Sequence, residues 1–226
     1  MGTLSVAQTD HLFWLGRYLE RVLVTLDLSS EVYDLMLDGA KDYDIKSLCQ
    51  RLSIPAIYEN SDDFINRYMY DAADPNSVVS NLNRAFDNAV VMRDVLTSHT
   101  LCYIELAMDK LKQASRSVSP MLEVQETVDY LYAFWGAVED YVTDVNTRYI
   151  MRTGRSIERL DLYLRLGLHT DRVHDETIRL VNRIYRSGVN YNNEVFQRLV
   201  ERSESDPEVV DPQQMLADIN NLVITF

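Results

Sequence analysis

Two short segments of the same kind constrain the fold of this chain more than any other feature of its sequence. Gly16–Arg21 reads Gly-Arg-Tyr-Leu-Glu-Arg, and Gly154–Arg159 reads Gly-Arg-Ser-Ile-Glu-Arg. The dipeptide Asp74-Pro75 also recurs, as Asp211-Pro212, at nearly the same offset along the chain. Self-similarity of this kind predicts a duplicated structural unit. We expect a first repeat over about 1–118 and a second, shortened repeat over about 119–226.

Apolar residues around the first segment follow alternating spacings of three and four, which predicts one long helix with a heptad stripe. The residues of this stripe are Leu12, Leu15, Leu19, Val22, Leu26, Ser29, Tyr33 and Met36. We expect Asp10 to cap the start of this helix and Gly39 to end it. The same stripe recurs in register around the second segment.

The rest of the chain also shows helical spacing, and no segment shows the alternation of a strand. The predicted further helices cover 45–52, 62–72, 78–111, 121–168 with a break near Asn146, 171–188, 190–202 and 212–226. These predictions describe an all-α, long-helix bundle that forms a single domain over 1–226. Because the second repeat is short, we expect apolar residues such as Leu222 and Ile224 to be exposed.

Charge and cysteine usage narrow the class of protein. The net charge is −13, from 35 acidic and 22 basic residues, and such an excess disfavours binding to nucleic acid or an anionic membrane. Cys49 and Cys102 lie in apolar helical patterns, and no Cys-x-x-Cys is present, so we expect reduced thiols and a cytoplasmic setting. We expect neither a signal peptide nor a membrane-spanning helix.

The charges of the repeated segments are the candidate functional groups. Arg17, Glu20 and Arg21 share one helix face, because they are spaced i, i+3 and i+4. This face lies opposite the heptad stripe and is flanked by apolar residues such as Phe13 and Val24, so the charges are predicted to be partly buried. Buried charges need partners, because an unpaired one costs several kcal/mol.

Two interpretations of these charges remain open. Arg17, Glu20 and Arg21 could join Arg155, Glu158 and Arg159 in an ion network that only holds two helices in register. Alternatively, the four arginines outnumber the two glutamates, and the surplus could hold a phosphate or carboxylate in a pocket lined by both segments. The surplus could also be neutralised by Asp87, Asp94 or Asp161.

No motif in the sequence names a reaction. The four histidines form no Glu-x-x-His pair of the kind that binds metal in helix bundles, so we predict no metal site. The sequence also has no Gly-rich phosphate loop and no nucleophile elbow, and we predict no cofactor. The catalytic residues are therefore unknown, and a non-catalytic role is the simpler interpretation.

Several segments together resemble a known family. Residues 13–21, Phe-Trp-Leu-Gly-Arg-Tyr-Leu-Glu-Arg, resemble the N-terminal signature of the alpha-E family of bacterial helical domains, which is named for its Glu-Arg motif. Residues 154–159 are similar to the second Glu-Arg motif of that family, and 74–78 are similar to its Asn-Pro-x-Ser segment. Residues 85–93 resemble an arginine-rich segment of the family, although Phe86 and Val90 stand where that segment has arginines.

The resemblance implies a protein that accompanies ATP-grasp-type amide ligases and transglutaminase-like proteins in the synthesis or modification of a peptide-like product. It suggests three hypotheses. The chain could be a non-catalytic helical scaffold that partners such a ligase. It could be an anion-, nucleotide- or substrate-binding protein, or an enzyme, that uses a pocket formed by both Glu-Arg motifs, with Asn88 and Arg93 of the family-like segment nearby. It could also be a bundle that forms a homo-oligomer through its shortened end.

Overall fold

The computed structural model describes residues 4–37, 44–118, 120–205 and 211–224, and these residues form ten helices and no strand. The predicted all-α fold class is therefore confirmed. The helices are α1 (Val6–Leu37), α2 (Ile45–Leu52), α3 (Ser61–Tyr70), α4 (Val78–Val91), α5 (Arg93–Ala114), α6 (Pro120–Tyr141), α7 (Val145–Leu166), α8 (Thr170–Ser187), α9 (Asn193–Glu204) and α10 (Pro212–Asn220).

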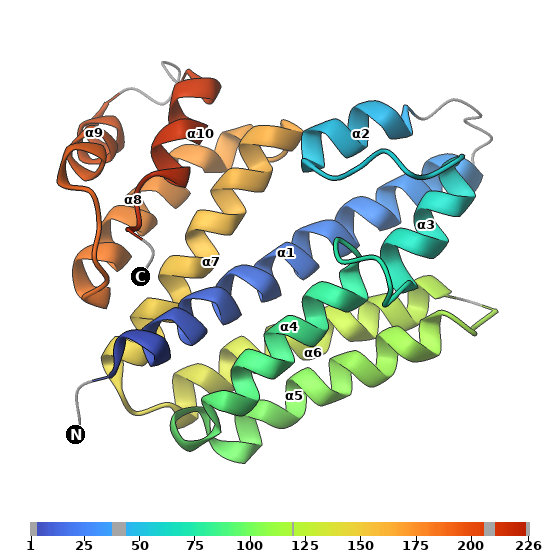
Figure 1. The fold of residues 1–226 in the computed structure, drawn as a ribbon, viewed down its shortest axis with the longest axis horizontal. Helices are drawn as coiled ribbons and strands as arrows, with labels where there is room; N and C mark the ends of the chain where they lie inside the picture. The colour runs from blue at the N-terminus through green and yellow to red at the C-terminus, as the bar shows by residue number, and fades with distance from the viewer. Residues whose placement is uncertain (1–3, 38–43, 119, 206–210, 225–226) are drawn as a thin grey trace.

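Helices α1 and α7 pack against each other and form the centre of the molecule (Figure 1). Helix α4 packs on α1, and α5 pairs with α6, while α8 and α10 pack on α7. Helix α1 buries apolar residues on both of its sides, because Leu15 and Leu19 of the heptad stripe and Phe13 and Val24 opposite it are all buried. This two-sided burial confirms the central position that the sequence predicts for the first long helix.

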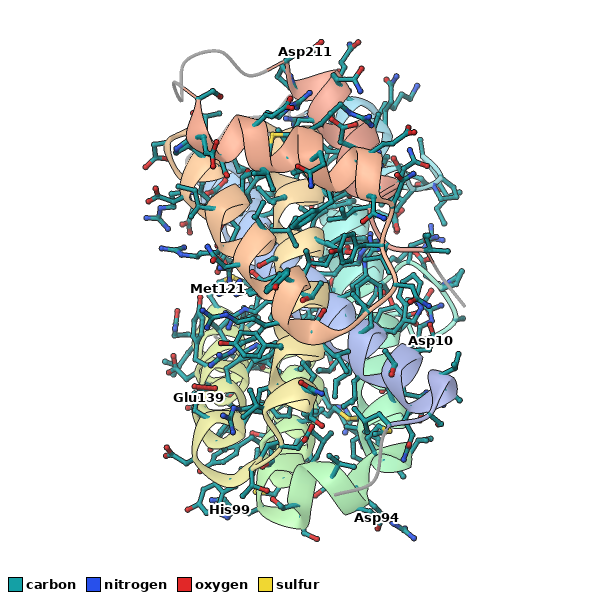
Figure 2. The ribbon with its side chains drawn as sticks, turned by 90° about the vertical axis from the view of Figure 1, so that its left-hand side faces the viewer. Asp10, Asp94, His99, Met121, Glu139 and Asp211 are labelled. Atoms are coloured by element: carbon teal, nitrogen blue, oxygen red, sulfur yellow. The ribbon has the colours of Figure 1, made fainter. Side chains whose placement is uncertain are left out.

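Helix α1 begins earlier than predicted. Asp10 lies within the helix and does not cap it (Figure 2). Instead, the hydroxyl of Ser5 accepts a hydrogen bond from the backbone N–H of Gln8 at 3.2 Å, and the backbone N–H of Ser5 donates to the Gln8 side chain at 2.9 Å. This reciprocal pair is a capping box, which satisfies two free N–H groups at once. Gly39, the predicted end, lies outside the described residues.

The single long helix predicted over 78–111 is wrong. The chain turns at Met92, and α4 and α5 pack against each other as a hairpin (Figure 1). Within α5, Thr97 has a φ of 66°, and its hydroxyl accepts from the N–H of Thr100, which restarts the helix. The apolar spacing continues through this turn, and neither glycine nor proline marks it, so the local signal is limited to the capping hydroxyl of Thr97.

Most other boundaries follow the predicted pattern. Helix α2 has the predicted bounds, and the break near Asn146 separates α6 from α7, where the Asp144 side chain accepts from the N–H of Thr147. Helix α3 is capped by Asn60. The Asp211 side chain caps α10, but this helix ends at Asn220 and does not run to the end of the chain.

The C-terminal end of the second, shortened repeat is more buried than predicted. Leu222 is fully buried, so its predicted exposure is wrong, whereas Ile224 is 55% exposed as expected. The reason is that the chain after α10 turns back and pairs with residues 190–192. The N–H of Asn192 donates to the carbonyl of Leu222 at 2.8 Å, and the N–H of Ile224 donates to the carbonyl of Asn190 at 3.0 Å.

The two halves share one element of packing, since α4 lies on α1 and α10 lies on α7. The duplication itself stays a prediction. Asp211 caps its helix directly, whereas Asp74 lies upstream of the Ser77 cap of α4 and accepts from the Tyr58 hydroxyl.

Cys49 and Cys102 are free thiols. None of the helices in the described ranges is both long enough and apolar enough to cross a membrane.

Candidate functional site

The backbones of α1 and α7 touch where the two repeated segments cross. A Cβ atom added at Gly16 would overlap the carbonyl oxygen of Met151, and one added at Gly154 would overlap the carbonyl oxygen of Phe13. Only glycine lets two helices approach this closely, because every other residue carries a Cβ. The glycine of each segment therefore accommodates the backbone of the opposite helix.

The arginines of α1 bind the glutamate of α7. Glu158 accepts hydrogen bonds from Arg17 Nε at 2.7 Å and from Arg21 Nε at 2.5 Å, so each carboxylate oxygen has its own guanidinium. The guanidinium of Arg17 also lies over the ring of Trp14, 5.0 Å from its centroid. We call this part of the crossing the Glu158 side.

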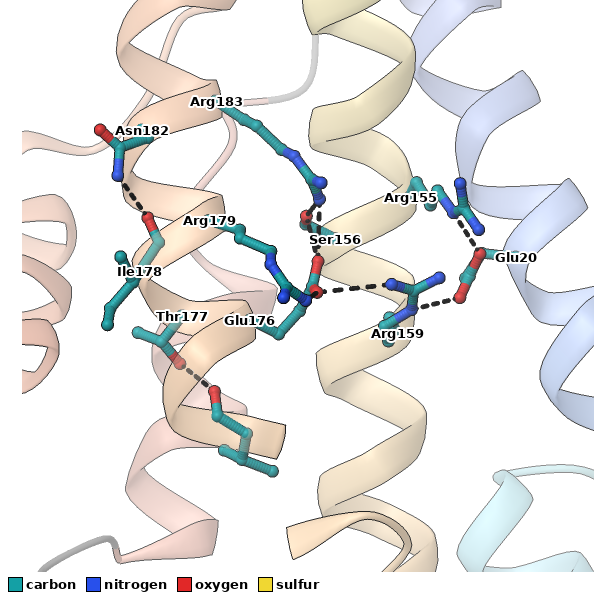
Figure 3. A network of polar contacts seen from close by, with 11 residues as sticks. Glu20, Arg155, Ser156, Arg159, Glu176, Thr177, Ile178, Arg179, Asn182 and Arg183 are labelled. Atoms are coloured by element: carbon teal, nitrogen blue, oxygen red, sulfur yellow. Dashed lines mark hydrogen bonds and ion pairs between the residues drawn. The ribbon is translucent and has the colours of Figure 1, made fainter. Parts of the chain in front are cut away.

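The arginines of α7 bind the glutamate of α1 in the same way. Glu20 accepts from Arg155 Nε at 2.7 Å and from Arg159 Nε at 2.5 Å (Figure 3). The guanidinium of Arg155 lies over the ring of Trp135 on α6, 4.5 Å from its centroid. We call this part the Glu20 side. The two glutamates thus exchange partners across the crossing, and among the described residues each forms ion pairs only with arginines of the other helix.

These glutamates are buried, with only 2% of Glu20 and 1% of Glu158 exposed. Burial lowers the pKa of Arg21, but the charge and hydrogen bond of Glu158 outweigh it and leave the pKa above its ordinary value. The pKa of Arg159 is raised in the same way, against burial, by Glu20 and Glu176. Arg21 and Arg159 therefore stay charged, and the structure brings the six motif residues together in a cross-helix network.

A third buried carboxylate, Glu176 on α8, extends the Glu20 side. It accepts from the Ser156 hydroxyl at 2.6 Å, and from Arg183 at 2.8 Å, Arg179 at 3.1 Å and Arg159 at 3.4 Å (Figure 3). Burial raises the pKa of Glu176, but these partners, above all the charge of Arg159, outweigh it and lower the pKa below its ordinary value. Helix α8 is thereby tied to α7.

The sequence carried a signal for Glu176 that our prediction missed. Glu176 lies three residues after Val173 and four before Leu180, both of which are buried on the inner face of α8. A glutamate in a buried helical stripe needs a cationic partner, so its position alone indicates a further ion pair.

The Glu158 side borders a pocket with a volume of about 330 Å³. It lies between α1, α4 and the turn before α4, and it is lined by Trp14, Arg17, Tyr18, Arg21, Pro75, Asn76, Asn81, Arg84 and Glu158. Arg84 was not among the predicted site residues, because it belongs to neither repeated segment. Arg17 and Arg21 of the first segment and Glu158 of the second line this pocket, whereas Glu20, Arg155 and Arg159 do not.

Asn88 and Arg93 do not join the network. The Asn88 amide oxygen pairs with His11 Nδ1 at 2.6 Å, and its amide nitrogen donates to the carbonyl of Arg84. Arg93 is the exposed first residue of α5, and its neighbour Asp94 lies at the end of the molecule opposite Asp211 (Figure 2). Neither side chain contacts a motif arginine or glutamate in the described part of the chain.

None of the three aspartates considered as neutralising groups pairs with a motif arginine in the described residues, although the charge of Asp161 helps to raise the pKa of Arg21. Asp87 and Asp94 are exposed. Asp161 is buried, but it pairs with Arg165 at 2.9 Å and accepts from the Asn220 amide at 2.8 Å. On the Glu20 side, Glu176 supplies a further carboxylate to Arg159, and it shares that carboxylate with Arg179 and Arg183.

The fold and the site define an all-α protein whose two central helices are joined by reciprocal Arg–Glu contacts around a glycine crossing. The chain belongs to the Alpha-E family, described as a predicted alpha-helical domain with a conserved ER motif, whose family model matches residues 7–192. Both repeated segments lie within the matched range, which confirms the resemblance noted from the sequence. No curated protein and no solved structure matches the chain significantly.

Proposed function

We propose that this chain is a non-catalytic helical accessory protein, a scaffold that partners an ATP-grasp-type amide ligase in making or modifying a peptide-like product. One observation supports the non-catalytic role most. Both motif glutamates are buried, and each carboxylate is hydrogen-bonded by two arginines of the opposite helix. Groups held in this way stabilise a helix pair and have no free oxygen for proton transfer to a substrate.

The partner in this proposal comes from the family resemblance, since ATP-grasp ligases accompany alpha-E proteins. An accessory protein of this kind needs a rigid body that presents fixed surfaces to its partner. The crossing of α1 and α7 supplies such a body, because close backbone contact and paired buried charges restrict sliding of one helix along the other.

Co-purification tests the proposal. The tagged chain is mixed with the ATP-grasp ligase from the same organism and, as a control, with an ATP-grasp ligase from an unrelated system. We expect a complex with the first ligase at micromolar concentration, no complex with the second, and no ATP turnover by the chain alone. Absence of a complex with the first ligase, or ATP turnover by the chain alone, would contradict the proposal.

A second candidate function is ligand binding, and the pocket on the Glu158 side favours it because both Glu-Arg motifs line that pocket. Self-association through the shortened end has less support, since Leu222 is buried and, of the two residues proposed for it, only Ile224 is exposed. Light scattering measures this directly, and a monomer across the micromolar range would exclude it.

A further inference from the structure

We propose that the pocket on the Glu158 side binds a small oxyanion, a phosphate or carboxylate group of a metabolite, through Arg17, Arg21 and Arg84. This inference goes beyond the accessory role and does not depend on the ligase. It also assigns a binding function to Arg84, which lies outside both Glu-Arg motifs.

The pocket has a local positive surplus in an acidic protein. Three guanidinium groups line it, against the one carboxylate of Glu158. Asp74 lies next to the lining residue Pro75, but it accepts from the Tyr58 hydroxyl at 2.6 Å and the Asn76 N–H at 2.8 Å. Even when this buried aspartate is counted, positive charge remains in excess. A bound oxyanion would neutralise this excess positive charge.

The motif arginines on this side have donors left over. Glu158 is bound through the Nε atoms of Arg17 and Arg21, and within the described residues their terminal nitrogens make no other hydrogen bond. These side chains are 16% and 32% exposed, so water or a ligand reaches them. A guanidinium fork matches the geometry of a carboxylate or phosphate, which makes these nitrogens suitable donors.

The third arginine is fixed in place by contacts that leave part of its fork unused. Arg84 Nη1 donates to the carbonyl of Pro75 at 2.7 Å and to the Asn81 amide oxygen at 3.4 Å. Its guanidinium also lies over the ring of Tyr18, 5.9 Å from the centroid. A donor that is already held loses little side-chain entropy on binding, and this preorganisation favours affinity.

The size of the pocket and the charge of the chain limit the ligand. A volume of about 330 Å³ lies at the small end of metabolite-binding sites. The net charge of −13 opposes a long polyanion such as nucleic acid. The Glu20 side is a weaker candidate, because Glu176 already occupies donors of Arg159, Arg179 and Arg183 there.

Calorimetric titration at low ionic strength, with inorganic phosphate and with succinate as separate probes, tests the inference. We expect a dissociation constant on the order of 1 mM for at least one probe. Arg84→Gln should weaken binding at least about tenfold, because it removes a charged donor. Arg93→Gln is the matched control, since it makes the same charge change on the same helical hairpin at an exposed residue outside the pocket, and it should leave binding unchanged.

The probe that binds identifies the chemistry. Phosphate alone indicates a phosphoryl ligand, succinate alone indicates a carboxylate ligand, and either result supports the site. No binding of either probe up to about 20 mM overturns it, and so does equal weakening by the two variants. If Arg84→Gln does not fold, the wild-type chain is labelled with phenylglyoxal. The probe should then protect Arg17 and Arg84 but not Arg93, and equal labelling with and without probe also overturns the site.

Discussion

The Glu20 side and the Glu158 side of the α1–α7 crossing contain the same pair of contacts in different surroundings. On the Glu20 side, the motif arginines also face Glu176, a buried carboxylate on α8 that binds Arg159. On the Glu158 side, the motif arginines line a pocket, and Arg84 adds a further positive charge to its lining. On one side a motif arginine binds a further protein anion, while on the other side the motif arginines line a pocket.

This difference shows that the Glu-Arg motif and the potential ligand site are separate properties. The motif fixes how two helices cross, and it does so in both directions with the same atoms. Whether an arginine of the motif can also meet a ligand depends on residues outside the motif. Glu176 and Arg84 are the residues that make the two sides unlike.

The largest effect is expected from removing a motif carboxylate. Glu158→Gln removes the buried partner of Arg17 and Arg21, while Glu20→Gln removes that of Arg155 and leaves Arg159 with Glu176 alone, and each change should lower the free energy of unfolding by about 3–5 kcal/mol. Urea unfolding followed by circular dichroism measures the loss. A free energy of unfolding within about 0.5 kcal/mol of the wild-type value would show that the network does not stabilise the fold.

Combining these changes with Glu176→Gln sharpens the comparison. Glu20 and Glu176 share Arg159, so Glu20→Gln and Glu176→Gln should be coupled by about 1 kcal/mol. Glu158 and Glu176 share no partner in the described residues, so that pair should be additive within about 0.5 kcal/mol. Equal coupling in both pairs would mean that the two sides are not independent.

The next largest effect is expected at the crossing itself. Gly16→Ala and Gly154→Ala each place a methyl group against the backbone of the opposite helix, and each should lower stability by about 3 kcal/mol. Gly136→Ala on α6 is the control, because a Cβ there meets no atom within 4 Å. It should raise stability by about 0.5–1 kcal/mol, as expected for alanine in a helix. Thermal melting of the three variants distinguishes these outcomes, and a harmless Gly16→Ala would contradict the close contact.

A smaller, pH-dependent effect is expected for Glu176. At neutral pH, Glu176→Gln should lower the free energy of unfolding by about 2 kcal/mol, because its arginines lose a charged acceptor. The folded pKa of Glu176 lies below the ordinary value of 4.5, so this stabilisation is present above pH 4.5 and is lost as pH falls through the folded pKa. The gap between wild type and variant should therefore narrow between pH 6 and pH 3, in urea titrations at each pH. A constant gap would contradict the pKa direction.

The sequence predicted the helical class and the central helix well, because apolar spacing and local stop signals are properties of short segments. The bounds of α2 follow directly from its pattern before Pro55. The hairpin between α4 and α5 was missed, since Met92 is buried at the turn and continues the apolar spacing. A turn that depends on tertiary burial leaves little signal in the local sequence.

The site was predicted in part for a similar reason. The matching segments indicated that Glu20 and Glu158 would be buried and near each other, but spacing along one helix does not tell which arginine binds which glutamate. Arg84 was missed because its position beside Arg17 depends on how α4 packs on α1. Arg93 was proposed from a family segment, and the turn at Met92 places it outside the site.

The close approach of Gly16 to the Met151 carbonyl, and of Gly154 to the Phe13 carbonyl, also limits how the chain can tolerate change. In most packed cores, an enlarged side chain can be compensated by a smaller one opposite it. At this crossing the opposing group is backbone, and both residues already lack a side chain, so nothing remains to be reduced. A search for second-site suppressors of Gly16→Ala at the crossing should therefore return only reversion to glycine.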